Sequence, residues 1–307
     1  MKILLDPRMI TPKHAEALRL VFPTVSFTED PADTVGVDAV FCHPAFAVPA
    51  KLDRYPLLEW VQIMMAGYDT ADVGYLRTRD LCVTNMKDIF HISIAEDVFA
   101  KILVLNRAVR HDLDAMSTGK WEPIRHLPEI YGSTVGIIGA GSIGSAVATR
   151  MQAFGAKVIG YRRKNAVTGG FDRILTGPDG LLELCRESDY VIVAMPLKQE
   201  TVKLVGKAEF AAMKQDALFI NVGRGETVDQ DALVEALRDG RIRGAGLDVT
   251  TPEPLPPNHP LWTLPNVFIT PHNASSSPFI WPRIREVLHE NIRRRLAGEK
   301  LLNEIDD

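Results

Sequence analysis

Residues 134–144 read TVGIIGAGSIG and contain the pattern GxGxxG, which begins at Gly139. The apolar run Val135–Ile138 before it is typical of a buried strand, and the segment Ser142–Phe154 after it has the spacing of a helix. Glycine-rich turns are common, so the pattern is informative only because it joins a strand to a helix. In this context the stretch predicts the first βα unit of a doubly wound α/β domain.

The glycines of such a unit have separate roles. Gly139 permits the tight turn, Gly141 lets a pyrophosphate approach the main chain, and Gly144 lets the helix pack close to the strand. The amides of Ser142 and Ile143 would face the phosphates at the positive end of the helix. We therefore expect a dinucleotide site here, with a purely structural turn as the alternative.

The end of the next strand predicts which dinucleotide binds. The expected strand Lys157–Tyr161 is followed by Arg162, Arg163 and Lys164, where an NAD site would carry a carboxylate for the ribose 2′-hydroxyl. A guanidinium can instead bind a 2′-phosphate through two hydrogen bonds. The sequence thus favours NADP(H), with Arg162 and Arg163 as phosphate ligands. The alternative is an exposed basic loop in a protein that also uses NAD(H).

Short apolar runs separated by helical segments extend over the rest of the chain, which indicates parallel sheets covered by helices on both faces. In the first hundred residues the expected strands are Ile3–Leu5, Ala39–Cys42, Leu58–Met64 and Leu81–Val83. From residue 134 they are Val135–Ile138, Lys157–Tyr161, Val191–Ala194, Leu218–Val222, Ala245–Val249 and Val267–Thr270.

Helix signals complete this outline. Thr11 and Pro12 predict the start of a helix that runs to about Leu20, and a single long helix is expected over Ser93–Met116. A further helix is expected over Asp229–Arg238, and the last one from Ser277 to Gly298. The prolines between residues 251 and 265 predict a rigid loop.

Composition excludes several classes of protein. The 307 residues exceed the usual size of one domain, and the net charge of −4 gives no attraction to nucleic acid or to an anionic membrane. Cys42, Cys82 and Cys185 have no paired spacing, so we expect core thiols rather than disulfides or a metal cluster. No apolar run approaches the length of a membrane span, and a cytoplasmic location is expected by default.

Three segments after the later strands resemble the signature of the D-isomer-specific 2-hydroxyacid dehydrogenases. They are Asn221–Glu226 (NVGRGE), Leu247–Pro254 (LDVTTPEP) and Thr270–Ser275 (TPHNAS). The N-terminal stretches MAGYD at 65–69 and SIAE at 93–96 are also similar to that family. Each motif alone could arise by chance, whereas the ordered set identifies the chain as a member.

The resemblance implies a catalytic triad of Arg224, Glu253 and His272. A guanidinium fork can bind the carboxylate of a 2-keto acid and polarise the adjacent carbonyl. An imidazolium can donate the proton that the alkoxide needs after hydride transfer, because the unperturbed pKa of histidine is about 6.5. A neighbouring carboxylate would orient the imidazole and favour its charged form.

The resemblance also implies several binding residues. The substrate carboxylate would meet backbone amides at Met65, Ala66 and Gly67, in addition to Arg224 and His272. The cofactor cleft would be lined by residues that follow the strands, with Asp248 beside the nicotinamide: Met195, Pro196, Val222, Gly223, Asp248 and Ser275. Three positions depart from the family pattern, namely Gly223 (usually serine or alanine), Asn273 (usually apolar) and Met195 (often threonine).

From these features we expect an α/β fold of two doubly wound parallel-sheet domains, with a Rossmann cofactor domain inserted into a flavodoxin-like substrate domain. Residues 1–98 and 276–307 would form the substrate domain, and 99–275 the NAD(P)-binding domain. The family resemblance implies a homodimer. The basic residues after Tyr161 and the short C-terminus favour a glyoxylate or hydroxypyruvate reductase.

Other functions stay open from the sequence. A D-3-phosphoglycerate or D-lactate type of dehydrogenase would share all of these motifs. A non-catalytic dinucleotide-sensing protein would retain the triad, although the chain has no long polar extension for recruiting partners. A formate dehydrogenase is expected to have glutamine in place of Glu253.

Overall fold

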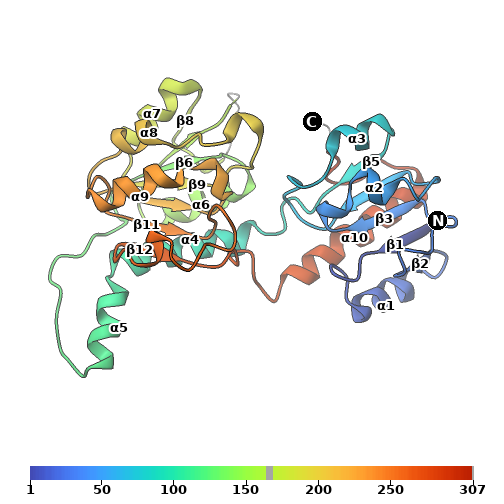
Figure 1. Cartoon of the computed structure of the whole chain (residues 1–307), viewed down its shortest axis with the longest axis horizontal. Coiled ribbons are helices and arrows are strands. Elements are labelled where there is room, and N and C mark those ends of the chain that lie inside the picture. The colour runs from blue at the N-terminus through green and yellow to red at the C-terminus, as the bar shows by residue number, and fades with distance from the viewer. Residues whose placement is uncertain (164–168, 306–307) are drawn as a thin grey trace. The chain divides into compact units, whose positions relative to one another are not determined.

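The computed structural model describes residues 1–163 and 169–305. The chain forms two compact units, Met1–Ile89 with Pro278–Asp307 and Phe90–Ser277 (Figure 1). The second unit begins earlier than the expected boundary at residue 99, because helix α4 (His91–Asn106) packs along α6 (Ser142–Ala153) and against the sheet of that unit. The roles of the two domains stay predictions: a substrate domain of residues 1–98 and 276–307, and a cofactor domain of residues 99–275.

The first unit contains a five-stranded parallel sheet in the order β2-β1-β3-β4-β5. This is the flavodoxin-like order, as expected. The strands are β1 (Lys2–Leu5), β2 (Ser26–Thr28), β3 (Ala39–Cys42), β4 (Trp60–Ile63) and β5 (Cys82–Thr84). Strand β2 was not expected, because this short edge strand carries no buried residue and therefore no apolar run.

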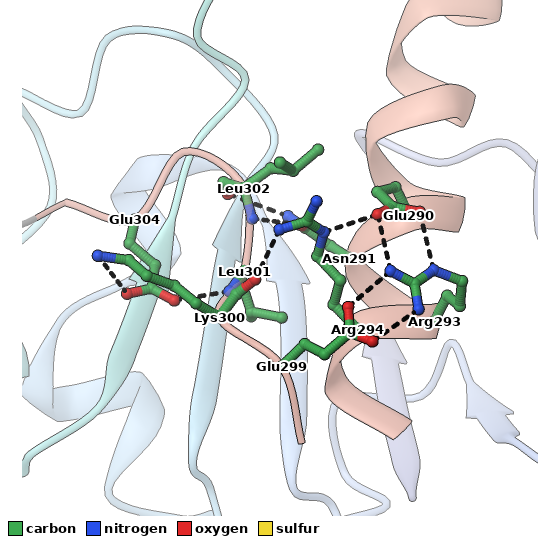
Figure 2. A network of polar contacts seen from close by, with 9 residues as sticks. All are labelled: Glu290, Asn291, Arg293, Arg294, Glu299, Lys300, Leu301, Leu302 and Glu304. Atoms are coloured by element: carbon green, nitrogen blue, oxygen red, sulfur yellow. Dashed lines mark hydrogen bonds and ion pairs between the residues drawn. The ribbon is translucent and has the colours of Figure 1, made fainter. Parts of the chain in front are cut away.

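Helices flank this sheet. Their bounds are α1 (Pro12–Val21), α2 (Pro49–Leu52), α3 (Val73–Thr78) and α10 (Ile280–Ala297), with a 3₁₀ turn η1 at Pro44–Phe46. Helix α10 ends at Gly298, whose φ of +69° permits the left-handed C-cap. Its last turn and the segment after it are joined by a polar network, in which Glu290 accepts from both Arg293 and Arg294 (Figure 2).

A buried polar link attaches α10 to the sheet. The side-chain amide of Asn291 donates to Gln62 Oε1 on β4 at 3.1 Å and to the carbonyl of Leu302 at 3.2 Å. Its side-chain oxygen accepts from the backbone amide of Leu302 at 2.7 Å. Figure 2 shows Asn291 and Leu302 facing one another. The C-terminal residues are therefore part of the first unit, although 188 residues of the second unit separate them from β5 in sequence.

The second unit contains a seven-stranded parallel sheet in the order β12-β11-β10-β9-β6-β7-β8. Counted from β6, this is the doubly wound order of dinucleotide-binding domains, extended by one strand beyond the sixth. The strands are β6 (Thr134–Ile138), β7 (Lys157–Tyr161), β8 (Arg173–Leu175), β9 (Tyr190–Val193), β10 (Leu218–Asn221), β11 (Gly244–Leu247) and β12 (Val267–Ile269). The six expected strands are confirmed, and β8 is a further short edge strand.

Six α-helices lie in the second unit among the described residues, together with short 3₁₀ turns. They are α4, α5 (Val109–Ser117), α6, α7 (Gly177–Glu187), α8 (Lys207–Ala212) and α9 (Gln230–Arg238), with η2 (Gln199–Thr201), η3 (Gly225–Thr227) and η4 (Pro260–Trp262). Asp229 caps α9 by accepting from the Ala232 amide.

The prediction of one helix over Ser93–Met116 was wrong. The chain forms α4 and then α5, because Ala108 adopts a left-handed conformation with φ of +50° and turns the main chain between them. Both segments have helical spacing, so the sequence pattern alone does not show the break. Helix α5 extends away from the sheet of its unit (Figure 1).

Cys42 and Cys185 are buried and Cys82 is partly buried, and none forms a disulfide. Burial raises the pKa of the Cys185 thiol to about 12. Among the described residues no helix is long and apolar enough to cross a membrane, and no group of side chains has the composition of a metal site.

Candidate active site

The glycine turn between β6 and α6 is closely packed at Gly139 and Gly144 and open at Gly141. Gly139 has φ of +111°, and a Cβ there would lie 2.7 Å from the carbonyl oxygen of Ala194. A Cβ on Gly144 would lie 2.2 Å from the carbonyl oxygen of Gly139, so the helix could not pack this closely with a side chain. At Gly141, by contrast, a Cβ would meet nothing within 4 Å.

The first turn of α6 offers the amides for an anion. No side chain caps this helix start, where Gly141 is the N-cap, and Ser142 and Ile143 are only partly buried. Uncapped amides at the N-terminus of a helix attract phosphate groups. The open space over Gly141 and these amides therefore fit a dinucleotide.

The basic residues after β7 lie beside an acidic side chain. Arg163 Nη1 donates to Glu200 Oε1 at 2.8 Å, and the Arg163 side chain is 64 % exposed. The Arg162 amide donates to the carbonyl of Leu175 at 3.1 Å, which fixes the main chain at the end of the strand. Lys164 lies outside the described residues. The contact with Glu200 would compete with a 2′-phosphate for Arg163.

Arg224 follows β10 in a turn held by Asn221. The side-chain amide of Asn221 donates to the carbonyl of Arg224 at 3.1 Å. Its side-chain oxygen accepts from the backbone amide of Gly223 at 3.0 Å. Asn221 is 1 % exposed, and the hydroxyl of Thr227 donates to the same Arg224 carbonyl. Arg224 Nη1 donates to the carbonyl of Gly223 at 2.9 Å. A buried side-chain amide thus fixes the backbone from which the guanidinium extends.

The departure at Gly223 has a steric reason. A Cβ at this position would lie 2.7 Å from the carbonyl oxygen of Met195, which follows the neighbouring strand β9. The Val222 amide donates to the Val193 carbonyl at 3.0 Å, so the two strand ends remain paired up to this point. Glycine therefore lets the segments after β9 and β10 touch, and Met195 and Val222 are buried beside them.

His272 and Glu253 form a direct pair. The imidazole Nδ1 lies 2.7 Å from Glu253 Oε2, and Glu253 Oε1 accepts from the Thr250 amide at 3.1 Å. The side chains of His272 and Glu253 are 44 % and 39 % exposed. With Nδ1 engaged by the carboxylate, Nε2 is the nitrogen that can face a substrate.

The segment that carries Glu253 is fixed by Gln230, the first residue of α9. Its side-chain amide donates to the carbonyl of Thr251 at 2.6 Å and accepts from the amide of the same residue at 2.9 Å. A Cβ on Gly225 would lie 2.0 Å from the carbonyl oxygen of Thr250. The residues next to Arg224 and those next to Glu253 are therefore in backbone contact.

Asp248 connects the end of β11 to the segment of His272. Its carboxylate is 3 % exposed and accepts from the amides of Asn273 and Ala274 at 3.0 and 3.1 Å. Its carbonyl accepts from the His272 amide at 2.8 Å. The hydroxyl of Ser93 on α4 donates to the carbonyl of Ser275 at 3.1 Å.

These contacts show how much of the expected site comes together. Arg224, Glu253 and His272 follow the neighbouring strands β10, β11 and β12, so all three belong to the carboxyl edge of one sheet. The first unit contains Met65, Ala66 and Gly67, which follow β4. There the side-chain amide of Asn85 donates to the carbonyl of Ala66 at 2.8 Å. The sequence placed Asn221 at the start of the motif NVGRGE without a role of its own, and it did not indicate Gln230, whose buried contacts to the main chain leave no motif.

Comparison with known proteins agrees with this geometry. A family profile described as "D-isomer specific 2-hydroxyacid dehydrogenase, NAD binding domain" matches residues 99–274. The chain is similar to a glyoxylate reductase of Korarchaeum cryptofilum, with 37% identity over 80% of this chain and 75% of the relative. It is also similar to a D-3-phosphoglycerate dehydrogenase of Methanocaldococcus jannaschii, with 34% identity over 78% of this chain and 46% of the relative.

A solved structure is similar over nearly the whole chain. It is the NADPH-dependent glyoxylate/hydroxypyruvate reductase of Sinorhizobium meliloti in complex with NADP and sulfate, which has a TM-score of 0.82 and 28% identity and covers 99% of this chain and 98% of that chain. The matched profile, the sequence identity and the two sheet orders give the same answer: the chain belongs to the D-isomer-specific 2-hydroxyacid dehydrogenase family and is an NAD(P)-dependent enzyme of that family.

Proposed function

We propose that this enzyme reduces a small 2-keto acid to the D-2-hydroxy acid with NADPH, and that glyoxylate and hydroxypyruvate are its substrates. The observation that carries the proposal is the pair formed by His272 and Glu253, which lies on the same sheet edge as Arg224. A positioned imidazole–carboxylate pair and a guanidinium are the groups that 2-keto acid reduction requires.

Each side chain has a defined task in this reaction. The guanidinium of Arg224 binds the substrate carboxylate and polarises the keto oxygen. The bound dinucleotide supplies the hydride. The Nε2–H of the His272 imidazolium donates its proton to the developing alkoxide, and the Glu253 carboxylate accepts from Nδ1 and stabilises the charged ring. In the reverse direction Nε2 takes the hydroxyl proton back.

Substrate and cofactor contacts complete the proposal. Backbone amides at Met65, Ala66 and Gly67 bind the substrate carboxylate. The glycine turn and the amides of Ser142 and Ile143 bind the pyrophosphate, while Asp248 contacts the nicotinamide carboxamide. The side chains expected to line the cofactor cleft follow β9, β10 and β12: Met195, Pro196, Val222, Gly223 and Ser275.

NADPH preference rests on Arg162 and Arg163. Two guanidinium groups after β7 favour a 2′-phosphate, and no carboxylate takes the position at the end of that strand. The similar reductase of S. meliloti, described as NADPH-dependent, supports the same choice.

A steady-state panel tests the function. Glyoxylate, hydroxypyruvate, pyruvate, phenylpyruvate and 3-phosphohydroxypyruvate are each assayed with NADPH and with NADH. The proposal expects kcat/KM to be highest for glyoxylate or hydroxypyruvate with NADPH. Preference for 3-phosphohydroxypyruvate would favour a phosphoglycerate dehydrogenase, and preference for pyruvate a lactate dehydrogenase. Cofactor binding without turnover of any keto acid would favour a dinucleotide sensor.

We also propose that the enzyme is a homodimer formed through α5 and the segment 118–130. Three large apolar side chains in this stretch are exposed to solvent: Leu113 (57%), Met116 (75%) and Trp121 (95%). A group of exposed apolar side chains is typical of an interaction surface. Beside them a hollow of about 820 Å³ is lined by α5, the end of α4 and residues 265–268. A second copy of this chain would cover both surfaces.

Light scattering tests the dimer. The wild type should have the mass of a dimer. The double variant Leu113→Asp/Met116→Asp should have the mass of a monomer and still bind NADPH. Exposed Leu20 on α1 of the first unit gives the control, because Leu20→Asp changes a comparable side chain outside the proposed interface.

A further inference from the structure

Helix α4 carries a lysine with no exposed area at the level of the sheet edge described above. The Lys101 ammonium donates to the carboxylate of Asp97, one turn earlier, and to the hydroxyl of Thr270 at 2.7 Å. Gly246 on β11 makes room for it, since a Cβ there would lie 2.8 Å from the Cβ of Lys101. Burial of an ammonium is costly, and apolar residues in place of a buried ion pair are often neutral or stabilising. Stability alone therefore does not account for Lys101.

A chain of hydrogen bonds leads from Lys101 to the segment of His272. The hydroxyl of Thr270, which accepts from Lys101, donates to Asp248 Oδ1 at 2.6 Å. The Asp248 carboxylate then accepts from the amides of Asn273 and Ala274. Hydrogen bonds thus link Lys101 to residues on both sides of His272. Thr270 precedes His272, and Asn273 and Ala274, which bond to Asp248, follow it.

The main chain at His272 needs such restraint. His272 has φ of +51°, a left-handed conformation that residues other than glycine adopt at an energetic cost. Its amide donates to the carbonyl of Asp248 and, at 3.0 Å, to that of Thr270. Strained backbone of this kind persists only where the surrounding contacts determine it.

The charges explain why a cation is needed. Two carboxylates, Asp97 and Asp248, lie in this buried cluster, and the Lys101 ammonium is 3.9 Å from Asp248 Oδ1. Burial raises the pKa of Asp97, while the hydrogen bond from Lys101 acts in the opposite direction. The segment after β12 adds the neutral Thr270 hydroxyl, and β10 adds the carbonyl of Asn221, which accepts from the Asp248 amide.

The Asp248 carboxylate accepts three hydrogen bonds, from the Thr270 hydroxyl and from the amides of Asn273 and Ala274. We propose that Lys101 is a positioning residue: its buried ammonium, through Thr270 and Asp248, holds residues 270–274, so that His272 is fixed in the orientation for proton transfer. This inference rests on the proposed function only for the role of His272, and the position of the loop can be measured without any substrate.

Hydrogen exchange measured by mass spectrometry tests the position of the loop. Lys101→Met retains the length of the side chain and removes its charge and donors. We expect the amides in the segment 271–275, which are those of His272 to Ser275 because residue 271 is proline, to exchange about 10-fold faster than in the wild type. Thr270→Val, which removes only the bridging hydroxyl, should change the same peptide in the same direction.

Asn106 supplies the matched control on the same helix. This residue is 1 % exposed and bonds to Tyr190 and Arg243, which lie at the opposite, amino edge of the sheet. Asn106→Leu therefore removes an equally buried polar link from α4 without touching the loop. It should lower thermal stability but leave exchange at 271–275 unchanged.

Kinetics test the route through His272. Lys101→Met should lower kcat about 10-fold while the KM for the keto acid and the affinity for NADPH stay near wild type, because misplacement of a catalytic group affects turnover first. In the His272→Ala background the same substitution should have no further effect, since the group that it positions is already absent.

The outcomes separate the two proposals. Unchanged exchange at 271–275 in both Lys101→Met and Thr270→Val, or a full additional loss of kcat in the His272→Ala background, would overturn the role of Lys101. A wild-type enzyme inactive with every keto acid would overturn the proposed function, and the exchange measurement would still decide whether Lys101 holds the loop.

Discussion

Nδ1 of His272 lies 2.7 Å from Oε2 of Glu253, and the other oxygen of that carboxylate accepts from the Thr250 amide. The ring is therefore oriented by a group whose own position is fixed by the main chain. Glu253→Gln retains an acceptor for the Thr250 amide but removes the charge opposite the ring. We expect kcat for keto acid reduction to fall at least about 10-fold with little change in NADPH affinity.

The control for this prediction is Glu226→Gln. Glu226 is an exposed carboxylate two residues after Arg224 and should be dispensable for turnover. Equal losses of kcat in the two variants would mean that general surface charge, and not the orientation of the imidazole, is responsible.

His272→Ala removes the proposed proton donor itself. Loss of a general acid typically costs about 10²-fold or more in turnover, so kcat should fall by that factor while NADPH still binds. Stopped-flow measurement of NADPH oxidation, together with fluorescence titration of the cofactor, checks both parts. His14→Ala, on α1 of the first unit, is the control. Full activity of the His272→Ala enzyme with any 2-keto acid would refute the assignment.

Arg224→Lys retains the positive charge and loses the planar fork. Because a lysine ammonium cannot bind a carboxylate through two parallel hydrogen bonds, kcat/KM should fall about 10²-fold, with the KM for the keto acid raised and kcat lowered. Arg238→Lys, at the exposed end of α9, should have no effect. A normal kcat/KM in Arg224→Lys would show that charge alone suffices at this position.

Cofactor choice is predicted to depend on Arg162 and Arg163. Replacing both with serine should raise the KM for NADPH about 10- to 100-fold and leave the KM for NADH nearly unchanged. Glu200→Gln should act in the opposite direction and lower the KM for NADPH, since Glu200 binds Arg163 in the structure. The control is Arg173→Ser on the neighbouring strand β8, which removes an ion pair with Glu187 of α7. An unchanged NADPH/NADH ratio in the double variant would contradict the prediction.

Stability of the first unit is predicted to depend on pH through Glu290. Hydrogen bonds from Arg293 and Arg294 lower the pKa of this carboxyl from 4.5 to about 2. A group whose pKa is lower in the folded state stabilises the fold above its unfolded pKa, and this contribution is lost as the pH falls through the folded pKa. Glu290→Gln should therefore lower Tm by about 1–3 °C at pH 7, and the difference should disappear between pH 4.5 and 2.

Thermal unfolding followed by circular dichroism at several pH values checks this. Glu286→Gln, one turn earlier on α10, provides the comparison. A Tm difference between Glu290→Gln and the wild type that persisted at pH 2 would mean that the carboxylate charge is not its source.

The sequence predicted the fold wherever a strand was buried on both faces. Strands β6, β7, β9, β10, β11 and β12 read as apolar runs, and the glycine turn identified their topology, whereas the edge strands β2 and β8 are short and partly exposed and carry no such run. The break between α4 and α5 was missed because one left-handed residue, Ala108, leaves the helical spacing on both sides intact.

The candidate site was predicted only in part, and for a related reason. Arg224, Glu253 and His272 could be found because they occur in ordered motifs. Gln230 and Lys101 bond to groups that are distant in sequence, Thr251 and Thr270. Such contacts depend on which strands become neighbours, so they can be recognised only after the sheet order is known.

The close approach of Gly223 to the main chain of Met195 couples the two segments that follow β9 and β10. A serine or alanine at 223 would place its Cβ 2.7 Å from the Met195 carbonyl oxygen, so either residue would require the turn after β9 to shift. Grafting the motif of a relative onto this enzyme therefore requires the two segments to be exchanged as a set.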